Sequence, residues 1–182
     1  MEFSVLETIA HDAVLEIKLS RPPVNALNFE LLDLLAKTFE QAPTQGYQGI
    51  VFTGGTKVFS GGLDVPYLLT CDAENLRACW SRFFDVARII AKSPIPVATA
   101  IAGHNPAGGC VLSLCSDYRV MAKGPFRLGL NETQVGLTVP FSIQYLMRRL
   151  IGVHKAERLI VAGAMIDAQQ AFDIGLVDEL AD

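Results

Sequence analysis

The chain has 182 residues, which suits a single domain over residues 1–182 and is long enough to bury a hydrophobic core. Hydrophobic residues make up 51% and charged residues 19% of the chain, a composition that excludes a disordered protein. The net charge is -4, and the lysines and arginines are scattered rather than gathered in a stripe. This charge pattern argues against nucleic acid as a partner.

The N-terminal segment shows no cationic stretch followed by a long apolar run, so the sequence predicts no signal peptide. It also has no run of about 18 apolar residues, the length that a membrane-spanning helix needs. We therefore expect a cytoplasmic protein that does not interact with membranes.

The four cysteines form no CxxC pair, and we interpret them as reduced thiols, with Cys110 and Cys115 buried. A metal site made by these two cysteines with His104 and Asp117 would not match the usual ligand spacing of zinc sites. The sequence therefore predicts ordinary packing at these positions and no metal site.

The start of the chain indicates a pair of strands followed by a helix. Residues 3–9 and 13–19 are rich in β-branched and apolar residues and predict two strands. Residues 28–42 carry apolar residues at helical spacing, with Asn28 as the expected N-cap and Pro43 as the expected stop.

The rest of the chain alternates between expected strands and helices. In chain order these are a buried strand at 49–55, a long helix at 73–94, a buried strand at 96–103, a helix at 108–117, short strands at 118–122 and 126–130, and short helices at 141–152, 154–163 and 167–175. The repeated β-β-α order predicts a layered or spiral α/β fold in which no linker separates a second domain.

Two loops rich in small residues follow buried strands, "GGTKVFSGGLD" at 54–64 and "GHNPAGGC" at 103–110. Neither is a P-loop, because Val58 follows Lys57 where Ser or Thr is needed, and neither has the G-x-G-x-x-G pattern. Glycines at strand ends most often serve tight turns. Two such loops can also aim backbone N–H groups at one point and form an oxyanion hole, and the second loop leads into a helix whose N-terminus favours negative charge.

Several motifs in register resemble one known family. The stretches "FSGGLD", "AGHNPAGGCVLSLCSDYRV" and "GLNETQVGL", in this order, are similar to the crotonase (enoyl-CoA hydratase/isomerase) superfamily. "PPVNAL" resembles the first CoA-contacting loop of that family, and the resemblance extends from Val14 to Asp182. Within the family, "NPAGGC" and "GLNETQ" look most like the mitochondrial-type delta-3,delta-2-enoyl-CoA isomerases.

The resemblance implies a crotonase-like spiral of β-β-α turns and an acyl-CoA thioester as substrate. Coenzyme A would enter as part of the substrate, and no separate cofactor is expected. The backbone N–H groups of Leu63 and Gly108 would bind the thioester oxygen, Glu132 would be the catalytic acid and base, and Asn131 would help to place the substrate or Glu132. The resemblance further implies that CoA and substrate contacts come from Val24, Ala26, Leu27, Ser60, Gly61, Gly62, Leu63 and Asp64.

Glu132 is the only acid in the stretch "GLNETQVGLTVP" at 129–140. It could simply occupy the first turn of a helix, where acids are stabilising. The resemblance favours catalysis instead, since one carboxylate can move a proton from C2 to C4 of a 3-enoyl thioester. Apolar neighbours such as Leu130 and Val135 would raise its pKa by desolvation.

The sequence departs from the family pattern in two ways. Hydratases of the family carry a second glutamate just after the "GGC" motif, where this chain has Val111, so the resemblance favours isomerisation. The family usually continues beyond "GLVDELAD" with helices that cover the active site and build trimers. We expect this C-terminal helical part to be short or missing, apolar surface to be exposed in its place, and a homo-oligomer, a trimer or a dimer of trimers, to form.

Three alternatives stay open from the sequence: a hydratase, another acyl-CoA enolate chemistry, and a non-catalytic acyl-CoA-binding module. His104 lies beside the expected oxyanion hole and could touch substrate. Arg148 and Arg149 suit a solvated helix face, although they could also meet a CoA phosphate from a neighbouring subunit.

Overall fold

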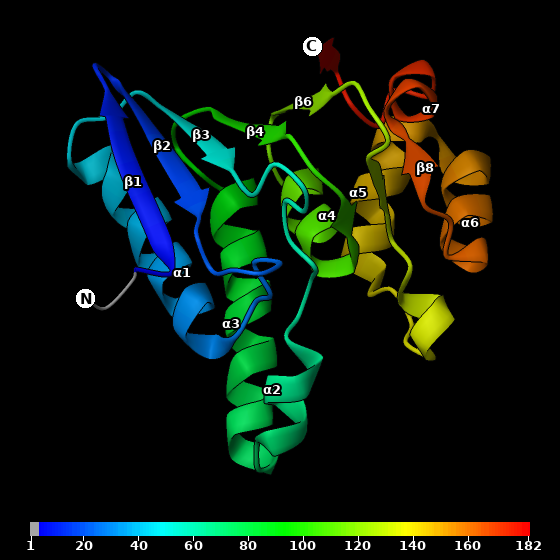
Figure 1. Ribbon diagram of the computed structural model, residues 1–182, viewed down its shortest axis with the longest axis horizontal. Coiled ribbons are helices and arrows are strands. Elements are labelled where there is room, and N and C mark those ends of the chain that lie inside the picture. The colour runs from blue at the N-terminus through cyan, green and yellow to red at the C-terminus, as the bar shows by residue number, and fades with distance from the viewer. Residues whose placement is uncertain (1–3) are drawn as a thin grey trace.

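The structure, a computed structural model, describes residues 4–182 and is built around a six-stranded sheet (Figure 1). The order of its strands is β1-β2-β3-β4-β6-β9; β1 and β2 pair antiparallel, and all other neighbours pair parallel. The strands are β1 (Leu6–His11), β2 (Val14–Leu19), β3 (Gly49–Thr53), β4 (Val97–Ile101), β6 (Tyr118–Ala122) and β9 (Glu179–Ala181).

A small three-stranded sheet and the helices complete the fold. In the small sheet β7 lies between β5, its parallel neighbour, and β8, its antiparallel neighbour. Its strands are β5 (Asn105–Pro106), β7 (Arg127–Gly129) and β8 (Ile166–Asp167). The helices are α1 (Phe29–Thr44), α2 (Val65–Thr70), α3 (Ala73–Ala91), α4 (Ala107–Leu114), the 3₁₀ helix η1 (Glu132–Val135), α5 (Phe141–Ile151), α6 (Val153–Ala162) and α7 (Ala168–Asp173).

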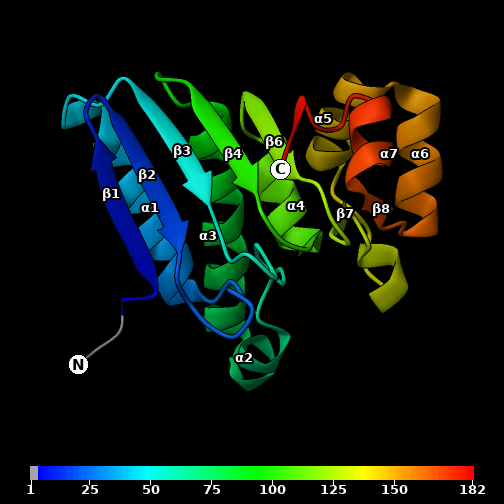
Figure 2. The same cartoon turned by 45° about the horizontal axis from the view of Figure 1, so that its top comes forward.

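Helices α1 and α3 cover one face of the large sheet, while α5, α6 and α7 gather on the side of the sheet where β6 and β9 lie (Figures 1 and 2). Every second residue of β3 and β4 is buried, and the residues between them are only half-buried. The sequence led us to expect fully buried strands here. The alternation arises because the helices pack on a single face of the sheet, and successive side chains point to opposite faces.

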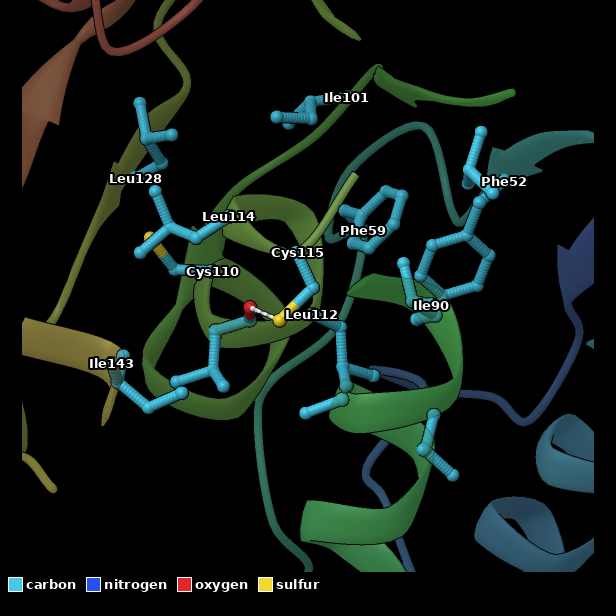
Figure 3. Packing of buried hydrophobic residues seen from close by; sticks show 14 of the residues in the cluster. Phe52, Phe59, Ile90, Ile101, Cys110, Leu112, Leu114, Cys115, Leu128 and Ile143 are labelled. Carbon is cyan, nitrogen blue, oxygen red and sulfur yellow. Dashed lines mark hydrogen bonds between the residues drawn. The ribbon is translucent and has the colours of Figure 1, made fainter. Parts of the chain in front are cut away.

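The core is continuous from the large sheet to α4. The rings of Phe39, Phe52 and Phe59 meet edge to face, with centroid separations of 5.6 and 5.2 Å. Figure 3 shows the buried side chains of α4 and its C-terminal neighbour Cys115, with Phe59 and Phe52 on one side and Ile143 on the other. Helix α4 is thus enclosed by apolar side chains and has a fixed position.

The expected burial of Cys110 and Cys115 is confirmed. Burial raises the pKa of the Cys115 thiol to about 12 and that of the Cys110 thiol further still, so both stay protonated at neutral pH. Both thiols therefore act as small apolar side chains of the core.

Several expected element boundaries were wrong by a few residues. Pro43 does not stop α1 but lies in its last turn, because a proline there removes only one helical hydrogen bond. Helix α3 ends at Ala91, before Pro94, and the helix expected at 108–117 occupies Ala107–Leu114. Phe3, the first residue of the first expected strand, lies outside the described residues.

Sequence patterns did not indicate α2, β5, β8 or β9, which are only two to six residues long. Within residues 4–182, no three His, Cys, Asp or Glu side chains are grouped so that they could hold a metal ion. The described helices also include none with the length and apolar character needed to cross a bilayer.

A buried arginine ties the last strand region to the sheet. The Arg119 side chain is 3% exposed and lies 2.7 Å from the Asp178 carboxylate. It also donates to the carbonyl oxygens of Ser116 (2.6 Å) and Leu176 (3.1 Å). The backbones of residues 119 and 178 are joined as well, because Asp178 N–H donates to Arg119 O at 2.9 Å. The chain before β9 is therefore held by one charged cluster.

Asp178→Ala should lower the free energy of unfolding by roughly 1–3 kcal/mol, because it leaves a buried charged donor without its acceptor. Urea denaturation would measure the change. Asp182→Ala is the matched control, since Asp182 pairs with Lys123 at the surface and its removal should leave stability unchanged. Equal stability of the two variants would contradict the role given to the Arg119 cluster.

Candidate active site

The segment that precedes α1 (residues 24–27) runs along the segment that precedes α2 (residues 61–64), and backbone hydrogen bonds join the two segments. Gly61 N–H donates to Val24 O at 2.7 Å, Leu27 N–H donates to Gly62 O at 2.8 Å, and Asp64 N–H donates to Leu27 O at 3.0 Å. These bonds fix the direction of the peptide planes between Gly61 and Asp64.

Side chains reinforce this pairing. Asn25 is buried, donates from Nδ2 to Phe59 O (2.9 Å) and accepts from the backbone N–H of Arg21 (2.8 Å). Ser60 donates from Oγ to Asn25 O at 2.9 Å, and the Arg21 guanidinium lies 2.8 Å from the Asp64 carboxylate. The two segments therefore form one rigid unit.

Two backbone N–H groups of this unit, those of Leu63 and Gly108, are oriented toward the same side of the two segments' contact, away from the carbonyl groups that pair the segments. Gly62 O points at Leu27, so the N–H of Leu63, on the opposite side of the same trans peptide, points away from Leu27. Gly108 is the second residue of α4, where helical N–H groups have no carbonyl to reach, and no side chain caps this end. Both donors can bind an oxygen atom.

These two donors lie next to each other because the residues at the contact, Gly62 and Gly108, have no side chains. A Cβ atom on Gly108 would lie 3.3 Å from Leu63 N and 3.2 Å from Gly62 Cα. A Cβ atom on Gly62 would lie 3.1 Å from Gly108 N, and Gly62 has a φ of 84°, in the left-handed region that favours glycine. The close approach of Gly62 and Gly108 therefore brings the backbone nitrogens of Leu63 and Gly108 to the same place.

Glu132 is the first residue of η1 and faces the same cavity as Leu63 and Gly108. Its Oε2 atom is buried and has no hydrogen-bond partner among the described residues. Burial raises the pKa of this carboxyl above its ordinary value, although a hydrogen bond from its own backbone N–H opposes the shift. An acid in such surroundings is suited to accepting and returning protons.

Two hydrogen bonds to the end of α6 hold η1 in place. Gln134 Nε2 donates to Gly163 O at 2.8 Å, and Thr133 Oγ1 donates to Ile160 O at 3.3 Å. Gly163 has a left-handed backbone, and a Cβ atom there would lie 2.6 Å from Thr133 Oγ1. Sequence reasoning missed these contacts; a glycine at the end of a helical stripe indicates a helix C-cap but not the segment that packs on it.

The cavity has a volume of about 260 Å³ and is mostly apolar. Five of the site residues expected from the sequence line it: Gly61, Leu63, Gly108, Asn131 and Glu132. Val111 lines it too, as do Val135 and Leu137, two of the apolar neighbours of Glu132 in sequence. The lining also includes residues that were not expected at the site: Val65, Trp80, Phe83, Phe84, Pro106, Ala107, Thr138, Pro140 and Ile143.

The other expected CoA contacts lie outside the cavity wall. Leu27 and Ser60 are fully buried, while Ala26 is half-buried and Val24 is exposed. Gly62 and Asp64 help to join the two segments, Gly62 through its backbone hydrogen bond with Leu27 and Asp64 through its ion pair with Arg21. Binding of CoA by this group of residues stays a prediction.

Two further candidates, His104 and Arg148, lie away from the cavity lining. His104 packs edge to face against Phe126, and its Nδ1 accepts from the backbone N–H of Arg127 at 3.2 Å. Arg148 lies 3.2 Å from the Glu157 carboxylate and is committed to that pair. Asn131 does line the cavity, and its Oδ1 is buried with no partner in the described chain.

A family model described as "Enoyl-CoA hydratase/isomerase" matches residues 10–181. The chain belongs to the enoyl-CoA hydratase/isomerase family. Among curated members of this family, it is 32% identical to the mitochondrial enoyl-CoA delta isomerase 1 of Mus musculus, over 97% of this chain and 62% of the relative. It is 30% identical to a probable enoyl-CoA hydratase of Mycobacterium avium, over 88% of this chain and 63% of the relative.

Solved structures of the enoyl-CoA hydratase/isomerase family share the fold. The human mitochondrial delta3-delta2-enoyl-CoA isomerase matches with a TM-score of 0.93 and 30% identity, over 98% of this chain and 71% of that one. An enoyl-CoA hydratase from Bacillus anthracis matches with a TM-score of 0.92 and 31% identity, over 98% and 70%. The crotonase-like fold is thus confirmed. The chain spans about 62% of the length of the mouse relative.

The raised pKa of Glu132 predicts a pH-dependent effect on stability. The stability that this group contributes is fully present below its ordinary pKa and is lost as pH rises through the raised folded-state pKa. Glu132→Gln should therefore melt at a higher temperature than the wild type at about pH 7 and at the same temperature at about pH 3. A gain of about 1 kcal/mol corresponds to roughly 2–4 °C.

Calorimetric melting at both pH values would measure this difference. Glu40→Gln, which changes an exposed glutamate on α1, is the matched control and should show no pH-dependent gain. A Glu132→Gln protein that melts below the wild type at about pH 7 would contradict the inferred burial of the charge.

Proposed function

We propose that the chain is an enoyl-CoA isomerase that moves a double bond from C3 to C2 of an acyl-CoA thioester. One observation carries the proposal: a single carboxyl group, Glu132, whose Oε2 has no partner among the described residues, shares a small apolar cavity with Leu63 and Gly108, which offer backbone N–H groups. This set of groups supplies one proton carrier and one anion-binding position, which is what such a migration requires.

In the proposed reaction, the thioester oxygen accepts hydrogen bonds from Leu63 N–H and Gly108 N–H. The ionised Glu132 removes a proton from C2, and the electron pair spreads into a dienolate whose negative charge rests on that oxygen. Glu132, now protonated, returns the proton to C4 as the double bond forms between C2 and C3. Atoms and charge balance over the two steps, and no other acid or base takes part.

Hydration is the second candidate, because relatives described as hydratases are also similar to this chain. Water addition needs one group to hold and deprotonate water while a carbon is protonated. Val111 lines the cavity at the position where the family's hydratases carry a second glutamate, and a valine cannot move protons. This residue favours isomerisation over hydration.

A non-catalytic acyl-CoA-binding module is the third candidate. Such a module would gain nothing from a half-buried carboxyl group whose Oε2 has no partner, since burial of a polar group without a hydrogen bond is unfavourable. The presence of Glu132 in the apolar cavity therefore favours an enzyme.

The acyl-CoA substrate, the homo-oligomer and the cytoplasmic location belong to this proposal. Large apolar side chains are exposed on and near η1 and α5, among them Val135, Phe141 and Tyr145, and apolar surface of this kind drives association. The mouse and human relatives carry the word mitochondrial in their names, so fractionation of cells is the direct measurement of the compartment.

Glu132→Gln should reduce turnover of a 3-enoyl-CoA by about 10²–10⁴-fold, because the amide cannot act as a base. Binding of the thioester should change little, since the lost interaction belongs to the transition state. Steady-state kinetics together with equilibrium titration of a saturated acyl-CoA would separate the two effects. Glu40→Gln serves as control, and near wild-type turnover by Glu132→Gln would remove Glu132 from the mechanism.

Isomerisation and hydration can be distinguished by product analysis. With 3-hexenoyl-CoA as substrate, 2-hexenoyl-CoA should accumulate, while 3-hydroxyhexanoyl-CoA should form more slowly by a factor of about 10²–10⁴. Liquid chromatography with mass detection would follow both products in one reaction. Formation of the hydroxyacyl product as fast as the double bond migrates would contradict the isomerase proposal and favour a hydratase.

A further inference from the structure

A second apolar hollow lies beside the cavity, between α3 and α5. It has a volume of about 630 Å³ and is open to solvent. We call it the α3–α5 groove. It is lined by Phe84, Ala87, Arg88, Ala91, Cys115, Phe141, Ser142, Ile143, Tyr145 and Leu146. Arg88, the one charged residue in this lining, is mostly exposed and lies 3.4 Å from Asp85, so the groove offers a surface suited to methylene groups.

The cavity and the groove share two wall residues, Phe84 and Ile143. The path from the cavity to the α3–α5 groove runs along α4. Gly108 and Val111 line the cavity, and Cys115 lines the groove. Cys115 lies seven positions after Gly108 in the sequence, which corresponds to roughly 10 Å along a helix. An acyl chain that leaves the oxyanion position along α4 therefore meets the shared wall before it reaches the groove.

Phe84 is held in this wall by its neighbours on α3. Its ring stacks on Trp80 with centroids 6.0 Å apart and an interplanar angle of 22°, and it meets Phe83 edge to face at 5.3 Å. Ile143, on the other side, is buried at 3% exposure. Movement of the Phe84 ring would break both aromatic contacts, which therefore stabilise its position in the wall.

We propose that Phe84 is a specificity-determining residue that closes the acyl end of the cavity and restricts the protein to short acyl chains. This inference rests on the proposed function. The cavity of about 260 Å³ lies below the range of about 300–1,000 Å³ that is usual for ligands of drug size, so it suits a short chain. Removal of the Phe84 ring would join the cavity to the α3–α5 groove and admit a long chain.

The test compares the affinities of hexanoyl-CoA and dodecanoyl-CoA for the wild type and for Phe84→Ala. Trp80 is the single tryptophan of the chain and lines the cavity, so its fluorescence reports binding without any turnover. The wild type should bind hexanoyl-CoA at least tenfold more tightly than dodecanoyl-CoA. In Phe84→Ala, the affinity for dodecanoyl-CoA should rise at least tenfold relative to that for hexanoyl-CoA.

Two further variants keep the test decisive. Phe126→Ala is the matched control, because Phe126 is also half-buried and has one aromatic partner but lines neither hollow. It should keep the wild-type ratio of affinities. Adding Ala91→Phe to Phe84→Ala fills the groove at an exposed position without adding a second tryptophan and should restore the preference for hexanoyl-CoA. Should Phe84→Ala not fold, Phe84→Leu replaces it, with a smaller shift in the same direction.

The outcomes separate this inference from the proposed function. Tight hexanoyl-CoA binding with an unchanged affinity ratio in the folded Phe84 variant would overturn the role of Phe84 and leave the isomerase proposal standing. Equal affinity of the wild type for both thioesters would also overturn the role of Phe84 and leave the isomerase proposal standing. Absence of binding by either thioester in every variant would overturn both proposals, whereas binding without isomerisation would overturn only the proposed activity.

Discussion

The candidate site depends on one close approach, the contact between the backbones of Gly62 and Gly108. Any side chain at either position would push the two segments apart, because the space is already filled by backbone atoms. Everything around the contact serves to hold it: the hydrogen bonds from Leu27 to the first segment, and the apolar enclosure of α4 around the second. Donors that are fixed in advance need no rearrangement when negative charge appears on a substrate.

Glu132 is placed by a different means. Its carboxyl group accepts no hydrogen bond from a neighbouring side chain, so the position of Glu132 is determined by η1. Gln134 and Thr133 hold η1 by hydrogen bonds to the end of α6. The segment that carries the carboxyl is therefore fixed by side chains other than Glu132 itself. The unpartnered Oε2 is unfavourable for folding, and a stable scaffold compensates for it.

Much of this arrangement could be read from the sequence, since alternating and helical patterns indicated most of the elements and the glycine loops indicated the free donors. The family motifs brought Leu63, Gly108 and Glu132 together, and the structure places all three on one cavity. The aromatic wall from α3 could not be foreseen, because Trp80, Phe83 and Phe84 follow the same 3.6-residue spacing as any buried helix face. The short strands β8 and β9 were missed because two or three residues carry no periodicity.

The ion pair between Arg119 and Asp178 joins positions 59 residues apart, and the segment between them carries η1, α5, α6 and α7. During synthesis the first strands, α1, α3 and α4 leave the ribosome early and can pair locally. Glu132, by contrast, has no support until Gly163 has emerged, and β9 cannot join the sheet until the chain beyond Asp178 is made. Contacts that span so many residues form slowly. Leu63 and Gly108 therefore lie in a part of the chain that is made before Glu132 and before the end of α6 that supports its segment.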